Sequence, residues 1–212
     1  MNIRKIVLAS ALATASLFAG TAAQASTVPF GVQNDVTAAT VAGWGFTQCF
    51  SATYGTFGLT TAGMLSGCSG DILMMAARRT GSDVFEVLAA ANFIDVTFDT
   101  GTGNVTHAAN GAEWYFNNNY SWGFAGAGDA VSRNECDTNG QNERDRLCWH
   151  TLSGFSGGWR AGTFTDLNDD NGWEKVLLVG SAQDNRVPEP ATLGLVGFAL
   201  LGLAAARKRK SA

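Results

Sequence analysis

The sequence predicts an all-β fold, a β-sandwich or jelly-roll-like domain between an N-terminal signal peptide and a single hydrophobic C-terminal helix. Three observations support this prediction. Short apolar runs in the central part alternate with Gly, Asn, Asp and Ser clusters at intervals of about ten residues, which is typical of sandwiches and barrels. No long amphipathic helix interrupts these runs. The even number of cysteines, four, indicates a disulfide-stabilised domain.

Residues 1–25 have the three parts of a secretory signal peptide. Arg4 and Lys5 supply the positive start, and residues 6–19 form an uncharged apolar stretch. Small residues then mark the site where we expect signal peptidase to cut, and they are Ala23, Ala25 and Ser26. A buried N-terminal helix is the alternative, but such a helix would not need these three parts in order. The chain is therefore predicted to be exported.

Residues 26–186 remain between the two end segments and are enough for one domain with its own core. This part holds 8 basic and 17 acidic residues, so its net charge is about −9. An acidic domain with scattered arginines lacks the cluster of basic residues that attracts nucleic acid or an anionic membrane. We therefore expect no nucleic-acid partner.

Nine runs are expected to form strands, because each is bounded by turn residues. They are Gly43–Phe50, Asp71–Arg78, Val84–Ala90, Phe93–Phe98, Glu113–Phe116, Tyr120–Phe124, Arg146–Leu152, Gly158–Phe164 and Glu174–Val179. Segment 71–91 is ambiguous, since its Leu, Met, Ala and Glu residues also favour helix. The break at Thr80–Asp83 favours a hairpin there, with a pair of short helices as the alternative.

Two disulfides are the expected state of the cysteines in an oxidising compartment. Three pairings are possible, and we favour Cys49–Cys68 and Cys136–Cys148 because each closes a short local loop. A metal site is the alternative. However, no Cys-x-x-Cys spacing occurs, and His150 is the only histidine near these cysteines.

The aromatic residues allow two interpretations. Exposed Trp and Tyr side chains stack on sugar rings in a carbohydrate-binding module, whereas strand aromatics usually pack in a core. Core packing is favoured, because most of these residues alternate with small or polar ones. The binding module would require at least two tryptophans on one exposed face, from among Trp44, Trp114, Trp122, Trp159 and Trp173.

Residues 154–158 match the G-x-S-x-G pattern around Ser156. An α/β-hydrolase needs a helix and a histidine after this serine, but no histidine follows Ser156. The order His107, Asp129, Ser156 would suit a chymotrypsin-like site, yet the serine lacks the preceding Asp of such proteases. A Gly/Ser-rich turn is therefore favoured. The enzymatic alternative is a small envelope hydrolase using His150 with a nearby carboxylate or Ser156, and it requires a polar cleft at His150.

Asp166, Asn168 and Asp170 place side-chain oxygens at alternate positions, as at the start of a calcium loop. An EF-hand would have Gly at the sixth position and Glu at the twelfth, where this chain has Asn171 and Leu177. Asp and Asn are also common in ordinary turns. We therefore expect a solvated turn and no cofactor, with Ca²⁺ as the alternative.

The C-terminal segment 187–212 combines a rigid triplet, an apolar stretch and a basic end. Pro188 and Pro190 fix φ and exclude helix across Glu189. Ala191–Ala206 is uncharged, and a helix of this length spans about 24 Å, less than the roughly 30 Å hydrocarbon layer. The segment is therefore a marginal permanent anchor in the inner membrane and an adequate transient one.

These features resemble the PEP-CTERM sorting signal of Gram-negative bacteria. The residues that carry the resemblance, besides the apolar stretch, are Val187, Pro188, Glu189, Pro190, Arg207, Lys208, Arg209 and Lys210. The resemblance implies processing by an exosortase, an integral-membrane, transpeptidase-like enzyme with a catalytic cysteine, near the Pro-Glu-Pro triplet. It also implies delivery to the cell envelope, the cell surface or the extracellular space after transient anchoring in the inner membrane.

The expected function is a non-catalytic structural or binding role at the envelope or in the exopolysaccharide matrix of a biofilm. The central region is similar to domains often attached to this signal, and no catalytic residue is carried over from them. A small secreted hydrolase and a carbohydrate-binding module are the two alternatives.

Overall fold

The first of two sheets is antiparallel, with the strand order β1-β4-β3-β12-β2. The computed structural model describes residues 26–182 except 153 and 156. The strands of this sheet are β1 (Gln33–Thr37), β2 (Thr47–Thr53), β3 (Ile72–Arg79), β4 (Val84–Asn92) and β12 (Trp173–Gly180). The ambiguous segment 71–91 therefore forms a hairpin of β3 and β4, as predicted.

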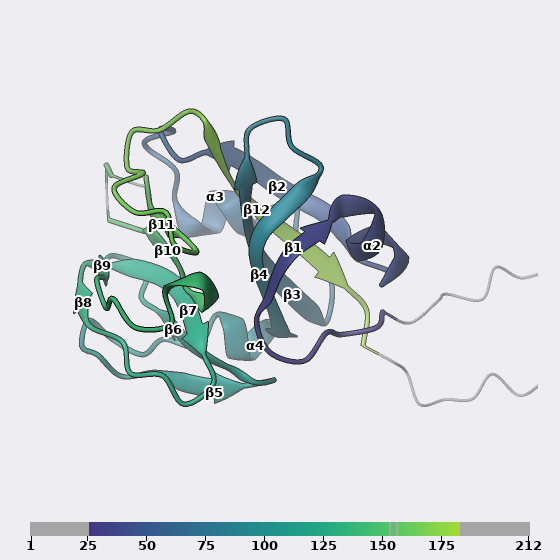
Figure 1. Ribbon diagram of the computed structural model, residues 1–212, viewed down its shortest axis with the longest axis horizontal. Helices are drawn as coiled ribbons and strands as arrows, with labels where there is room; N and C mark the ends of the chain where they lie inside the picture. The colour runs from purple at the N-terminus through teal and green to yellow at the C-terminus, as the bar shows by residue number, and fades with distance from the viewer. Residues whose placement is uncertain (1–25, 153, 156, 183–212) are drawn as a thin grey trace, which may run out of the picture.

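The second sheet is also antiparallel, with the order β11-β10-β7-β6-β5. Its strands are β5 (His107–Ala109), β6 (Ala112–Phe116), β7 (Ser121–Gly126), β10 (Leu147–His150) and β11 (Gly158–Ala161). A separate short hairpin joins β8 (Arg133–Asn134) to β9 (Cys136–Asp137). In Figure 1 the second sheet and this hairpin lie on the side of the molecule away from α2 (Ala38–Gly43).

The main core lies between the two sheets. The first sheet contributes aliphatic side chains such as Leu73, Met75 and Val87, and the second contributes large aromatic ones such as Trp122 and Trp149. These side chains are fully buried. Large aromatic side chains remove the most apolar area from water, so this layer supplies most of the hydrophobic stabilisation. The predicted β-sandwich is confirmed.

Each sheet also has a covered outer face. Val41 of α2 and Phe46 pack on the outer face of the first sheet, against residues such as Met74 and Leu88. The outer face of the second sheet carries a smaller cluster that includes Tyr115. The β8–β9 hairpin covers this cluster through Cys136 and the neighbouring loop. The candidate site lies at the edge of this hairpin.

One predicted strand is wrong. Phe93–Phe98 has the aromatic and β-branched residues of a strand, but its first part is the short helix α4 (Phe93–Val96). Val96 is buried, and its carbonyl accepts a hydrogen bond from Trp122 Nε1 at 2.9 Å. Burial against the second sheet therefore outweighs the strand propensity of this segment.

The other differences concern boundaries and polar elements. Predicted strand Gly43–Phe50 begins at the last residue of α2, and the observed strand starts only at Thr47. β1 was not predicted, because its sequence QNDVT is mostly polar. The remaining short elements are α3 (Thr61–Leu65) and the 3₁₀ turn η2 (Glu143–Asp145).

Both favoured disulfides are present. Cys49 pairs with Cys68, and Cys136 pairs with Cys148. The first ties β2 to the residues after α3, and the second ties the β8–β9 hairpin to β10. The described residues contain no free cysteine.

The two ends of the described domain lie side by side. Ser26 N donates to the Ser181 carbonyl at 3.1 Å, and Figure 1 shows both ends leaving on the side of α2. Within residues 26–182, apart from the two undescribed positions, no helix is long and apolar enough to cross a membrane. The signal-peptide and sorting-segment predictions fall at positions 1–25 and 187–212, outside the described residues.

Candidate ligand-binding site

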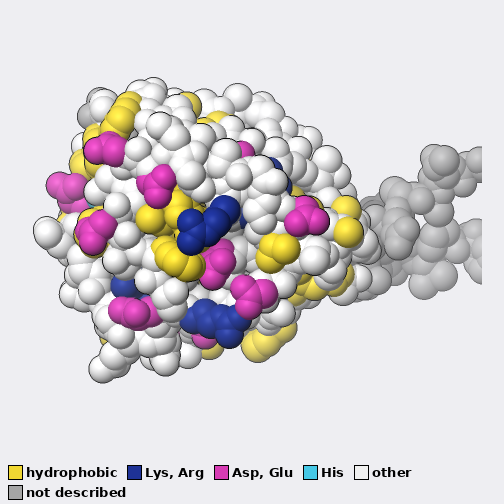
Figure 2. Space-filling model, turned by 45° about the horizontal axis from the view of Figure 1, so that its top comes forward, with side chains coloured by type: hydrophobic (Ala, Val, Ile, Leu, Met, Phe, Trp, Pro, Cys, Tyr) yellow, Lys and Arg dark blue, Asp and Glu magenta, His cyan; other side chains and the backbone are white. Residues whose placement is uncertain are grey.

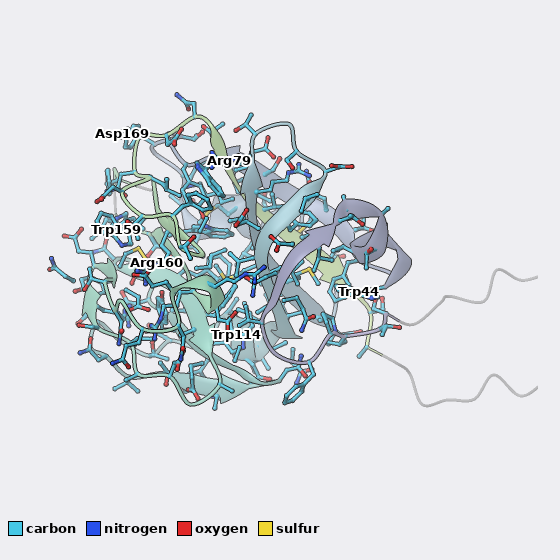
Figure 3. The ribbon with its side chains drawn as sticks, in the orientation of Figure 1. Trp44, Arg79, Trp114, Trp159, Arg160 and Asp169 are labelled. Carbon is cyan, nitrogen blue, oxygen red and sulfur yellow. A yellow bond between two sulfur atoms is a disulfide. The ribbon has the colours of Figure 1, made fainter. Side chains whose placement is uncertain are left out.

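A pocket of about 250 Å³ lies between the β8–β9 hairpin and the C-terminal end of β10. It is lined by residues from the hairpin, from β10 and β11, and from two loops: Asn134, Glu135, Thr138, His150, Phe155, Trp159 and Asn168. In Figure 3 Trp159 lies on the opposite side of the molecule from Trp44. The pocket is smaller than the roughly 300–1,000 Å³ typical of drug-sized ligands, so its size suits a small polar group or a single sugar unit.

A β-bulge turns Trp159 toward this pocket. The register of β10 and β11 pairs Cys148 with Arg160 and Trp149 with Gly158, so Trp159 has no partner. A bulge of this kind places two successive side chains on the same face of a sheet. Trp159 therefore packs half-buried against the outer-face cluster instead of entering the core between the sheets.

His150 is 4% exposed at the end of β10 and forms the inner wall of the pocket. Its ring centroid lies 4.8 Å from that of Phe155, and Nδ1 lies 3.8 Å from Glu135 Oε2. Burial lowers the pKa of His150, and this effect exceeds the opposing effects of the Glu135 carboxylate and the Asn168 side chain. The imidazole is therefore neutral at neutral pH.

Glu135 is held at the mouth of the pocket by its backbone. Its φ is 65°, a left-handed conformation that is strained for a residue other than glycine. Its N–H donates to Tyr120 Oη at 2.8 Å, and the next residue, Cys136, is bonded to Cys148. The Glu135 side chain remains 48% exposed. The carboxylate is thus available to a ligand on a fixed support.

Lys175 on β12 is a buried cation whose charge acts on His150. Its side chain is fully buried, and burial lowers its pKa to about 8. The positive charge of Lys175 lowers the pKa of His150 by less than the Glu135 carboxylate raises it. The negative charge of Glu135 therefore dominates the electrostatics at His150.

Four polar atoms of the pocket have no hydrogen-bond partner within the part of the chain that the structure describes: His150 Nδ1 and Nε2, Trp159 Nε1 and Asn168 Oδ1. Asn168 acts on the pKa of His150, but no contact between them has the geometry of an ordinary hydrogen bond. Leaving a buried polar group unpaired costs about 1–3 kcal/mol. Because both donors and acceptors are present, a ligand with hydroxyl groups would satisfy them.

Buried Arg146 stabilises the hairpin that forms one wall of the pocket. Its guanidinium forms an ion pair with Asp137 and donates to the carbonyls of Gln141 at 2.6 Å and Ala130 at 3.1 Å. Charge-assisted bonds of this kind are stronger than neutral ones. Together with the disulfide of Cys136, they hold the wall in place before any ligand arrives.

The structure separates the tryptophans that sequence analysis singled out. Trp114, Trp122 and Trp173 are buried, whereas Trp44 and Trp159 are half-buried on opposite sides of the molecule (Figure 3). No two of these five share an exposed face. The core-packing interpretation is thus correct for three of them, and Trp159 alone lines the pocket.

The candidate catalytic residues do not come together. His107 Nε2 lies 2.9 Å from Asp95 Oδ1, and its ring stacks on Phe98 with 4.6 Å between centroids. Asp129 instead faces Arg146, with Oδ2 and Nη2 3.5 Å apart. Ser156 lies outside the described residues.

Two glycines within residues 154–158 have packing roles. A Cβ on Gly158 would lie 2.1 Å from a ring atom of Tyr54, and a Cβ on Gly157 would lie 2.6 Å from the Asn168 carbonyl oxygen. Only glycine permits such close approaches. Packing therefore accounts for these two positions without an enzymatic role. His150 nevertheless does lie in a polar pocket, as the hydrolase alternative requires.

The three candidate calcium ligands have separate roles in their loop. Asp170 Oδ1 accepts from Gly172 N at 2.6 Å, as in an ordinary turn. Asp166 has a positive φ of 60°, and Asn168 lines the pocket. Among the described residues, no three or more His, Cys, Asp or Glu side chains are grouped so as to hold a metal ion.

Sequence reasoning missed the hairpin residues Asn134, Glu135 and Thr138, and also Phe155. Strands of two residues leave no periodic pattern, so this hairpin is indistinguishable from a loop in the sequence. The sequence did offer one indication of this site. Glu135 is next to Cys136, and His150 is two residues after Cys148, so the Cys136–Cys148 disulfide brings the two side chains close.

The comparisons with known proteins concern the C-terminal segment only. A family model described as the PEP-CTERM protein-sorting motif matches residues 186–210. A search of curated proteins and a search of solved structures found no match. The matched segment is the one whose residues resemble this signal. The chain therefore carries a PEP-CTERM sorting signal, which implies processing by exosortase and export to the envelope or surface of a bacterium.

Proposed function

We propose that this exported protein is a non-catalytic binding protein of the cell surface, and that its pocket holds a sugar unit of the surrounding exopolysaccharide. The observation that supports this proposal is the set of unpaired polar atoms of His150, Trp159 and Asn168 around one pocket. Sugar hydroxyls both donate and accept hydrogen bonds, so they match this mixture. The aromatic rings of Phe155 and Trp159 supply the apolar surface on which a sugar ring packs.

The position of the pocket agrees with surface display. Ser26 and Ser181 lie together at the end of the domain that leads to the sorting signal. Trp44 is at that end, because its carbonyl accepts from Thr27 N at 2.7 Å, and Trp159 lies on the opposite side in Figure 3. A domain attached through its C-terminal end would thus turn the pocket away from its attachment point.

The hydrolase is the second candidate, and one contact favours it. His150 Nδ1 lies 3.8 Å from Glu135 Oε2, which is a plausible base and carboxylate pair in a polar pocket. Most glycosidases, however, use two carboxylates that flank the reacting bond, and among the described residues Glu135 is the only carboxylate that lines this pocket. Release of shortened oligosaccharides from a polysaccharide by the purified protein would support this second candidate.

Replacement of Trp159 tests the binding function. We expect Trp159→Ala to lower the affinity of the purified exported protein for matrix polysaccharide at least tenfold, about 1.4 kcal/mol, because the ring face and the Nε1 donor are both lost. Isothermal calorimetry measures this loss. Trp44→Ala is the matched control, since Trp44 is also half-buried but lies across the molecule.

Equal affinity of the two variants would contradict a role of this pocket in binding. Thermal unfolding of both variants shows whether either change acts through stability alone.

A further inference from the structure

We propose that the pocket selects a sugar unit that carries a protonated amine, an amino sugar, whose ammonium group pairs with Glu135 over the rings of Trp159 and Phe155. This inference rests on the proposed function and specifies its ligand class. The other sources of such a cation, a free amine or a basic peptide, lack the hydroxyls that the remaining polar atoms of the pocket require.

The charges that face the pocket are the first support. Glu135 is the only charged side chain among the seven described residues that line it, because the buried imidazole of His150 is neutral. The opposing charge of Lys175, on β12 of the first sheet, acts on the ring less than the charge of Glu135 does. A cation entering the mouth therefore meets an exposed carboxylate and no Lys or Arg side chain among the described residues that line the pocket.

The aromatic side chains are the second support. Phe155 and Trp159 line the pocket, and the exposed ring of Phe57 continues this surface, with its centroid 5.5 Å from that of Phe155. Aromatic faces attract ammonium groups within about 6 Å of the ring centroid. Rings combined with one carboxylate are thus a suitable environment for an ammonium group attached to a sugar.

The backbone of Glu135 is the third support. A glutamate at φ 65° is more strained than glycine or asparagine would be at this position. The strain persists because the Tyr120 hydroxyl and the Cys136–Cys148 disulfide fix the residue on both sides. Strained residues held in this way are concentrated at ligand sites, where they orient a functional side chain.

The remaining polar atoms fit the hydroxyl groups of the same unit. Trp159 Nε1 is a donor, Asn168 Oδ1 is an acceptor, and a neutral imidazole offers one of each. Asn134 and Thr138 add further polar groups on the hairpin wall. An amino sugar therefore engages the carboxylate with its amine and these atoms with its hydroxyls.

The charge on the rest of the domain agrees with a cationic ligand. Residues 26–186 hold about twice as many acidic as basic residues, 17 against 8. On the face in Figure 2, Lys and Arg side chains lie among Asp and Glu side chains and form no continuous basic patch. Long-range attraction thus favours a polycation over a polyanion.

Three probes test the proposal with the purified exported protein: oligomers of glucosamine, of N-acetylglucosamine and of glucose. The first carries amines, and the other two are neutral. Calorimetry at about pH 6, where most amines of the glucosamine oligomer are protonated, should show at least tenfold tighter binding of that oligomer. Glu135→Gln should remove this preference while leaving weak binding of the neutral oligomers. Glu86→Gln is the matched control, because Glu86 is a partly exposed glutamate on β4 outside the pocket.

Each outcome has one meaning. Equal affinities for the three oligomers, or a preference that survives Glu135→Gln, would overturn the amine assignment and leave the proposed sugar-binding function standing. Failure of all three oligomers to bind would count against the proposed function itself. Glu135→Asn is the second variant, since asparagine adopts the left-handed conformation readily and keeps the hairpin folded without the carboxylate charge.

Discussion

Burial opposes the protonation of both Lys175 and His150. His150 stands out in the sequence as a histidine near two cysteines, but no pattern in the sequence places a lysine in the core between the sheets. Lys175 follows Trp173 by two positions on β12, so strand alternation puts both on the same buried face. Charge alone would have placed Lys175 at the surface.

The pH dependence of stability tests the burial of Lys175. Its pKa is about 8 in the folded protein and 10.5 in an exposed lysine, so the unfolded chain binds more protons between these values. The free energy of unfolding should therefore rise from pH 8 to 10, by as much as about 3 kcal/mol, and the rise should disappear in Lys175→Met. Urea unfolding at several pH values measures it.

An identical rise in both proteins over that interval would show that another group causes it. Burial also lowers the pKa of His150, so the unfolded chain binds more protons at this imidazole below pH 6.5. The free energy of unfolding should therefore decrease as the pH falls below 6.5.

Among the elements, long apolar strands were predictable and short polar ones were not. β3, β4 and β12 followed from their apolar runs, because a strand buried on both faces leaves a continuous hydrophobic signal. β1 is polar, and α4 has a strand-like sequence that only its contact with Trp122 explains. The pocket depends on the β8–β9 hairpin and on a bulge in β11, and neither has a sequence period.

The disulfide of the hairpin should affect both stability and binding. Removal of Cys136–Cys148 by paired substitution to serine should destabilise the domain by about 3 kcal/mol, since it releases a short loop. It should also weaken sugar binding, because it frees Glu135 from its fixed position beside His150. Calorimetry at a temperature where the variant remains folded measures the affinity.

The other disulfide supplies the control for this experiment. Paired serines at Cys49 and Cys68 open a loop of similar length, and neither residue lines the pocket. We expect a comparable loss of stability and unchanged affinity. A similar loss of affinity in both double variants would mean that general loosening, not the hairpin, controls binding.

At the scale of the whole molecule, the sorting signal and the pocket differ in how far the sequence alone predicts them. The sorting signal was readable from sequence, because its information lies in a short linear motif at residues 186–210. The pocket was not, because its residues come from five segments that only the sandwich and the Cys136–Cys148 link bring together. Delivery and the proposed binding site are thus encoded separately, and the pocket lies across the domain from the end where Ser26 and Ser181 meet.

NMR of the tryptophan indole groups tests the pocket most directly. The chain has six tryptophans. Three indoles already donate inside the core, those of Trp114, Trp122 and Trp149, at 2.9–3.1 Å from their acceptors. Trp159 Nε1 has no partner among the described residues. Addition of glucosamine oligomer should therefore shift the Trp159 indole N–H signal, in a saturable manner, and leave the three core signals in place.

A Trp159 signal that stays in place during titration with glucosamine, N-acetylglucosamine and glucose oligomers would contradict sugar binding at this pocket.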